Sequence, residues 1–287
     1  MTFLQGRING LTEELAATLH RLASDVKPKT VHLLRTTIRR MESLVSYAHP
    51  DLGKKLERNL DKLAGLRKRA GRVRDFDIQL ELLDVLANRS TTRDRDALAE
   101  LLKAKRTRQA KRLSSAVQKL NDSKLLARLR RIGEKVADGP AEEIRPLAPL
   151  EEARMRLGHL ADDYAPRQEL KPVRLHGARI QLKKIRYLAE LAEESPDQKT
   201  LMQDLKSVQD ALGEWHDWQQ LSTSAEKYFR DRVNCPLLRE IRALLAARQS
   251  IANAAIVKLL ALHSTSSPAK KLPTAVQPLR TMVRLAR

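Results

Sequence analysis

The sequence contains one pattern of histidine and basic residues twice. In both copies a basic residue follows the histidine after three positions, and a basic pair follows after seven and eight. The residues are His32, Arg35, Arg39 and Arg40 in the first copy, and His176, Arg179, Lys183 and Lys184 in the second. A helix turns by about 100° per residue, so the histidine and the residues three and seven positions later fall within roughly 60° of one another. A stripe of cations repels itself unless an anion lies against it, so the pattern predicts anion binding.

Each copy is followed by a second motif at similar spacing. The first is Gly71-Arg72-Val73-Arg74-Asp75-Phe76-Asp77, which begins 39 residues after His32. The second lies within residues 205–217, where Gly213 follows His176 by 37 residues. The chain therefore reads as an internal repeat in which each half carries a basic helix and a second helix with acidic and basic residues.

With four motifs in this order, the sequence resembles the CHAD domain family, an all-helical domain whose members bind inorganic polyphosphate. The resemblance covers roughly residues 10–263. It implies an all-α fold of two tandem four-helix-bundle-like repeats with a basic groove or pore between them. We place the domain at residues 8–263, with repeat one at about 8–137, repeat two at about 147–263, and a basic flexible tail at 264–287.

A polyphosphate chain presents a row of charged phosphates and no bases, so its site needs cations and hydrogen-bond donors on rigid supports. Arginine suits this task because its planar fork donates two parallel hydrogen bonds to one phosphate. The first candidate contacts are Arg35, Arg39, Arg40, Arg179, Lys183, Lys184 and Arg186. The histidines His32 and His176 join them, and Arg74, Lys206 and His216 form a second set.

The acidic and histidine residues inside the basic motifs carry two further expectations. Asp75, Asp210 and Asp217 are expected to brace arginine or lysine side chains through hydrogen bonds. Neighbouring arginines should lower the pKa of His32 and His176, and a bound phosphate should raise it. Affinity for polyphosphate is therefore expected to strengthen as the pH falls from about 8 to 6.

The two copies differ at positions that weaken the first one. Glu42 stands where the second copy has Arg186, and Ala64 and Gly65 stand where it has Lys206 and Ser207. Other cations on the same helix as Gly65 could compensate, namely Arg67, Lys68, Arg69 and Arg72.

The net charge of +20 and the pI of about 10.4 point to a polyanionic partner. Nucleic acid bound through charge alone is the main alternative to polyphosphate. Aromatic residues make up only 3% of the chain, which disfavours binding of single strands by base stacking. No helix-turn-helix signature is present either. Binding of nucleic acid is therefore expected to be non-specific.

No motif in the sequence predicts catalysis, a cofactor or a metal. The chain has no P-loop, nucleophile elbow or Gly-rich dinucleotide loop, and it lacks the ExExK signature of the triphosphate-tunnel enzymes to which CHAD domains are often fused. It also lacks HExxH and Cys/His spacings typical of zinc sites. We expect a protein that is not an enzyme. An enzyme acting on phosphate polymers and a metal-binding protein are the less favoured alternatives.

Apolar residues recur at spacings of three and four, and glycine is scarce, which predicts helices throughout. The expected helices cover about 8–24, 29–48, 51–87, 93–120, 123–136, 147–164, 173–194, 196–230 and 236–263. Ser195 is predicted to cap a helix that begins at Pro196. Trp215 and Trp218 are three apart on one helix and are expected to pack in the core.

The single cysteine, Cys235, excludes an internal disulfide and fits a reducing compartment. The sequence shows no signal peptide, and no uninterrupted apolar run approaches 18 residues, so no membrane partner is expected. The expected location is the cytoplasm, and the resemblance implies polyphosphate granules there.

Overall fold

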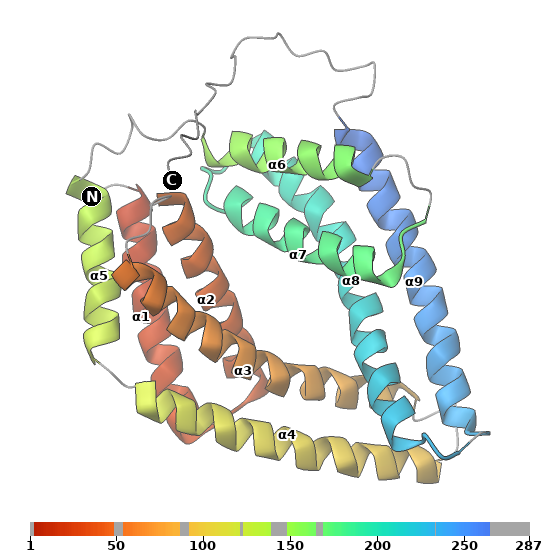
Figure 1. The fold of residues 1–287 in the computed structure, drawn as a ribbon. Coiled ribbons are helices and arrows are strands. Elements are labelled where there is room, and N and C mark those ends of the chain that lie inside the picture. Colours follow the sequence, from red (N-terminus) through yellow and green to blue (C-terminus); the bar gives the residue numbers. More distant parts are fainter. Residues whose placement is uncertain are drawn as a thin grey trace, which may run out of the picture.

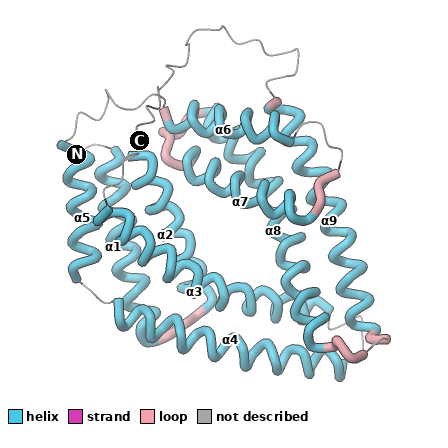
Figure 2. The backbone as a smooth tube through the Cα atoms, viewed as in Figure 1, coloured by secondary structure: helices cyan, strands magenta, loops and turns pink. Residues whose placement is uncertain are grey.

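The computed structural model describes residues 3–48, 54–86, 92–120, 123–138, 148–164, 169–232 and 234–264. Throughout these ranges the regular structure is helical and contains no strand (Figure 2), so the predicted all-α class is confirmed. The helices are α1 (Phe3–Ser24), α2 (Pro28–Ala48), α3 (Lys54–Val85), α4 (Thr92–Leu120), α5 (Ser123–Asp138), α6 (Pro149–Tyr164), α7 (Pro172–Ala189), α8 (Pro196–Tyr228) and α9 (Pro236–His263).

Proline begins several of these helices, because its fixed φ suits the first turn and its missing N–H is not needed there. At α8 the predicted cap is confirmed: the Ser195 hydroxyl accepts a hydrogen bond from the backbone N–H of Gln198 at 3.1 Å, and Pro196 follows it. Helix α7 ends at Ala189, five residues before the predicted end. After it, the N–H groups of Leu191 and Ala192 donate to carbonyls three residues earlier, which tightens the last turn into a bend.

The two sequence halves meet along two pairs of helices. Helix α2 of the first half contacts α7 of the second, and α3 contacts α8. In Figure 1 these four helices surround the middle of the molecule. Helices α1, α4 and α5 lie on the outer side of α2 and α3, and α6 and α9 lie on the outer side of α7 and α8. The helices that carry the two histidine motifs therefore face each other, which is compatible with the expected pair of repeats.

Two apolar clusters hold this arrangement. The larger one runs through both halves and includes Leu34 and Ile38 of α2 and Leu182 and Ile185 of α7. Burial of these side chains fixes which face of each helix turns inward, and so it also fixes where the adjacent basic residues lie. Each fully buried leucine or isoleucine stabilises the fold by about 1.5–3 kcal/mol relative to an exposed one.

The second cluster joins the far ends of the two long helix pairs, α3–α4 and α8–α9 (Figure 1). It contains Leu86, Leu102, Trp218 and Phe229 among others. Trp218 belongs to this cluster, whereas Trp215 is fully buried in the larger one. The prediction that both tryptophans pack in the core is confirmed, and α8 links the two clusters.

Several sequence predictions fall outside the described residues. These are residues 49–53 before α3, most of the joint predicted at 138–149, and all of the predicted tail beyond Ser264. The connection between the helices predicted at 51–87 and 93–120 is described only from Thr92, where α4 already begins.

Helix α9 contains a long apolar stretch. Arg248 and Lys258 interrupt its apolar sequence, yet by length and composition it is sufficient to cross a membrane. Core helices meet the same criterion, and α9 packs against α8 and α6 with Ile241, Ile256 and Leu259 buried. Of the most apolar stretch of α9, 28% is buried inside the bundle, so this packing accounts for part of its apolar character.

Candidate functional site

Four of the predicted cations come together where α2 faces α7. They are Arg35 and Arg39 of α2 and Arg179 and Lys183 of α7, and we call them the central cations. Burial lowers the pKa of all three arginines, and their guanidinium groups stay charged at neutral pH. Burial, together with the charges of Arg179, Arg39 and Arg35, lowers the pKa of Lys183 to about 7. The structure thus concentrates positive charge from both halves at one place.

Two carboxylates face the central cations from the second pair of helices, Asp75 on α3 and Asp217 on α8. Burial raises the pKa of Asp75, against the opposing effect of Arg35 and Arg179. Burial raises the pKa of Asp217 to about 6, and the charge of Asp75 adds to this effect. Two carboxylates do not balance the charge of four central cations.

The acids were predicted to brace basic side chains through hydrogen bonds. Among the described residues, neither Asp75 nor Asp217 forms a side-chain hydrogen bond to a central cation, and each acts on them through space. Asp210 is exposed on α8. The carboxylates therefore reduce repulsion among the cations without fixing their direction by hydrogen bonds.

The histidines lie at the edge of this cluster. Much of the His32 side chain is exposed, and the burial of the rest, followed by the charges of Arg74 and Arg35, lowers its pKa. The rings of His176 and His216 lie 5.3 Å apart, which brings α7 and α8 together at this point. Burial, with Arg179 as the next cause, lowers the pKa of His216 to about 3, so it is a neutral hydrogen-bonding group at physiological pH.

Two other predicted contacts are engaged in ion pairs. Glu190 accepts a hydrogen bond from Arg40 Nε at 3.0 Å and one from Arg186 Nη1 at 2.7 Å. Because Arg40 lies on α2 and Arg186 on α7, this carboxylate ties the two halves together. The guanidinium of Arg186 also lies over the ring of Tyr187, 4.6 Å from its centroid. Arg40 and Arg186 are thus partly neutralised before any anion arrives.

We expect Glu190→Gln to lower the free energy of unfolding by about 2 kcal/mol, because it removes the charge that holds both arginines. Urea unfolding monitored by circular dichroism measures this. Glu193→Gln is the matched control, since Glu193 is exposed three residues further on. An equal loss in both variants would show that the Glu190 ion pairs contribute no stability of their own.

The remaining predicted contacts differ in how they relate to the cluster. Arg74 of α3 forms an ion pair with Glu81 at 3.0 Å and still acts electrostatically on Asp75 and Asp217. Lys184 is exposed, and within the described chain it forms no ion pair. Lys206 is exposed on α8, about 15 Å along the helix from His216. The structure therefore brings Arg74 and Lys184 to the site and leaves Lys206 away from His216.

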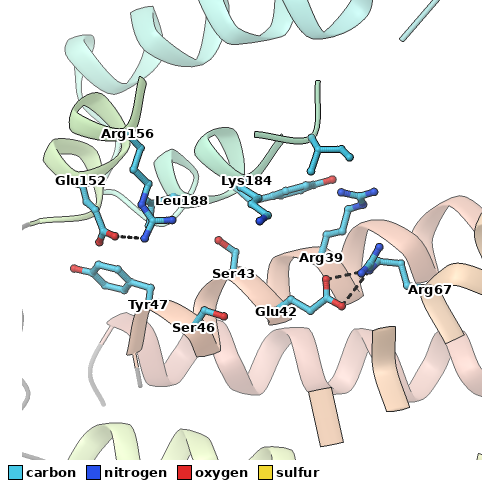
Figure 3. A pocket seen from close by; sticks show the side chains of 12 residues that line it. Arg39, Glu42, Ser43, Ser46, Tyr47, Arg67, Glu152, Arg156, Lys184 and Leu188 are labelled. Atoms are coloured by element: carbon cyan, nitrogen blue, oxygen red, sulfur yellow. Dashed lines mark hydrogen bonds and ion pairs between the residues drawn. The ribbon is translucent and has the colours of Figure 1, made fainter. Parts of the chain in front are cut away.

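A cavity of about 430 Å³ opens beside the central cations, between α2, α3, α6 and α7. Figure 3 shows Arg39 and Lys184 pointing toward it from facing helices. Its other charged lining residues are paired with each other: Glu42 with Arg67 at 3.0 Å, and Glu152 with Arg156. Arg39 belongs both to this cavity and to the central cations, so the two are continuous.

The Glu42–Arg67 pair accounts for one departure of the first copy. The first copy has an acid at position 42 where the second copy has a cation. This acid accepts a hydrogen bond from Arg67 of α3 and so holds Arg67 against α2. Arg69 and Arg72, which were considered as compensating cations, line depressions beside α4 instead. Of that basic run, Arg67 lines the cavity but is already paired with Glu42, so, among the described residues, the unpaired cations of α2 at the site are Arg35 and Arg39.

Sequence reasoning missed the roles of two residues. Glu190 follows Arg186 by four positions, a spacing that places the two on one helix face and could have signalled the pair. Tyr187 is buried and lies close enough to Arg35 and Arg39 to affect the pKa of both. No sequence pattern marks Tyr187, because its contacts come from the other half. Within the described ranges, no three His, Cys, Asp or Glu side chains lie together in a group that could hold a metal ion.

Comparison with known proteins places the chain by family. The CHAD domain model matches residues 7–226. A crystal structure of the CHAD domain from the plant Ricinus communis is similar, with a TM-score of 0.68, 18% identity and 90% of each chain covered. PptA from Streptomyces chartreusis is also similar, with a TM-score of 0.58 and 19% identity, over 91% of this chain and 97% of that one. No curated protein matches the sequence. Since the family model covers most of the chain, this protein belongs to the CHAD domain family.

Proposed function

We propose that this protein binds inorganic polyphosphate at the central cations and is not an enzyme. The observation that carries the proposal is the assembly of Arg35, Arg39, Arg179 and Lys183 from two facing helices, partly buried, where nearby carboxylates offset the cost of burial and repulsion only in part. Such a cluster is costly in the absence of an anion, because like charges in a partly dehydrated place repel strongly. A chain of phosphates supplies the missing negative charge.

The geometry favours a linear polymer over a compact anion. The central cations come from both halves, and Arg39 leads from them into the cavity where Lys184 points. Phosphates along one chain can occupy the cluster and the cavity together, and the side chains need little ordering because their helices are held in the core. We further propose that the bound polymer localises the protein to polyphosphate granules in the cytoplasm.

A competition titration tests the proposal against nucleic acid. Labelled long-chain polyphosphate is displaced by DNA, RNA, pyrophosphate or ATP at two salt concentrations. All polyanions will bind more weakly at high salt, so the comparison among them decides. Polyphosphate binding that persists at a salt concentration where DNA and RNA dissociate supports the proposal. Equal displacement by DNA at both salt concentrations would favour a generic nucleic-acid surface, and release of orthophosphate would indicate an enzyme.

We expect Asp217→Asn to strengthen polyphosphate binding by about tenfold at pH 8, which corresponds to roughly 1.4 kcal/mol. At that pH the Asp217 carboxyl, with its pKa of about 6, is charged and repels the ligand. The control is Asp210→Asn, which removes an exposed carboxylate two turns away on the same helix. Affinities come from isothermal titration. Weaker binding in the Asp217 variant would mean that the carboxylate orients the cations, as the sequence suggested.

A further inference from the structure

A second set of cations lies outside the central site, between the exposed faces of α3 and α4. Two adjoining open depressions, of about 460 and 420 Å³, share Arg69, Ala116 and Lys119 in their lining. Six cations line the two depressions, and we call them the outer cations. They are Lys62, Arg69 and Arg72 of α3, and Lys111, Arg112 and Lys119 of α4.

The outer cations face away from the first site. Positions 67 and 69 of a helix are 200° apart, so Arg67 and Arg69 point to nearly opposite sides of α3. Arg67 faces α2, where it pairs with Glu42, whereas Arg69 lies beside α4. An anion bound at the outer cations therefore lies on the other side of α3 from the cavity that Arg67 lines.

The outer cations also differ from the other exposed charges of the same helices. Towards the N-terminus of α4, Lys103 pairs with Glu100, and Arg106 pairs with Asp77. Residues 101–120 contain no acid at all. Within the described ranges none of the six outer cations forms an ion pair, and Asp61 is the one acid lining either depression. A solvated helix face that served only solubility would carry charges of both signs.

We propose that the outer cations form a second binding site for inorganic polyphosphate, so that one protein molecule holds two chains or two segments of one chain. The inference rests on the proposed function, since it assigns the same ligand class to a separate surface. Lys62 and Arg72 are ten residues apart, so the row of cations extends over about 15 Å of α3. Six cations over that distance match a densely charged polymer whose phosphates are joined directly.

Nucleic acid fits this surface less well. No aromatic side chain lines either depression, so bases of a single strand have nothing to stack on. A duplex is usually read by a protruding helix that enters its major groove. The outer cations instead line hollows between two helices. The Ser115 hydroxyl and the exposed lysine and arginine donors suit phosphate oxygens.

Calorimetric titration with short, length-fractionated polyphosphate tests the second site by its stoichiometry. We expect two ligands per wild-type chain. The outer variant Arg69→Gln/Arg72→Gln/Lys111→Gln should retain one, and the central variant Arg39→Met/Lys183→Met should retain the other. The matched control is Lys227→Gln/Arg239→Gln/Lys258→Gln, which removes three exposed cations elsewhere and should keep both ligands.

Salt dependence and bridging provide independent measurements. The central variant is compared with a variant that carries the central and the outer substitutions together. The combined variant should show a slope of log affinity against log salt concentration that is smaller by about two to three. Long polyphosphate should bridge wild-type molecules into large particles, seen by light scattering, and either variant should abolish this.

Different outcomes separate this inference from the proposed function. Two ligands bound by the outer variant, as by the control, would overturn the second site. Displacement of the outer ligand by duplex DNA at an equal phosphate concentration would overturn the choice of ligand. A single wild-type ligand that only the outer variant removes would support the outer site and refute binding at the central cations.

Discussion

Replacing Arg39 and Lys183 together by methionine will weaken binding of long-chain polyphosphate by about a hundredfold or more. Each residue supplies a charge-assisted hydrogen bond in a partly dehydrated place, and such bonds contribute about 1.5–3 kcal/mol each. The two residues occupy the same position in the two sequence copies, so the change removes one cation from each half. Isothermal titration at fixed salt measures the loss.

Methionine is unbranched like both side chains but carries no charge, so the same variant tests the cost of the cluster in the unliganded protein. Burial opposes the charge on each of the two residues, and Arg35 and Arg179 repel it. We therefore expect the thermal midpoint of the unliganded variant to equal or exceed that of the wild type. The control Arg239→Met/Lys258→Met removes two exposed cations of α9. If it weakens binding as much, net charge and not the cluster determines affinity.

Affinity for long-chain polyphosphate will fall by about tenfold or more between pH 7 and pH 9, and Lys183→Arg will remove most of this dependence. In the free protein burial, reinforced by Arg179, Arg39 and Arg35, lowers the pKa of Lys183 to about 7, whereas an adjacent phosphate chain raises it again. Binding above pH 7 therefore takes up a proton, and affinity decreases as that proton becomes scarce. Arginine stays charged throughout this range, and the first copy already has arginine at the equivalent position.

Below pH 7, the change of affinity with pH follows from the Asp217 carboxylate. The pKa of Asp217 is raised to about 6 mainly by burial, and a bound polyanion raises it further, so binding also takes up a proton between about pH 6 and 7. Lys183→Arg should keep this part of the profile, and Asp217→Asn should remove it. The measurement uses long chains because few of their phosphates are terminal, so titration of the ligand itself contributes little to the pH profile. A flat profile for the wild type from pH 6 to 9 would contradict both assignments.

The sequence predicted the direction of this pH dependence but attributed it to histidines. His32 and His176 do have lowered pKa values, as expected from their arginine neighbours. Periodicity could not show that Lys183 is more deeply buried than either histidine, because its burial comes from helices of the other half as well as its own. Contacts between distant segments decide which of several cations titrates near neutral pH.

The fold was more predictable than the site. Helix patterning and proline positions indicated each described helix, since burial of an apolar stripe and capping are local properties. The repeated motif indicated which two helices would face each other. The pairing of Arg40 and Arg186 with Glu190, and of Arg67 with Glu42, required knowledge of which side chains meet across helices. A stripe of cations in a sequence does not reveal which members are already neutralised.

The apolar cluster at the far ends of α3–α4 and α8–α9 has a consequence for how the chain folds. Its members Leu102 and Trp218 come from opposite halves and are more than a hundred positions apart in the sequence. Helices and their neighbouring pairs form from local contacts, whereas such distant contacts close slowly. We therefore expect closure of the two halves to be a late step, and it is the step that first brings Arg35 and Arg39 against Arg179 and Lys183. A polyanion present during refolding should accelerate that step, because it neutralises the charges as they converge.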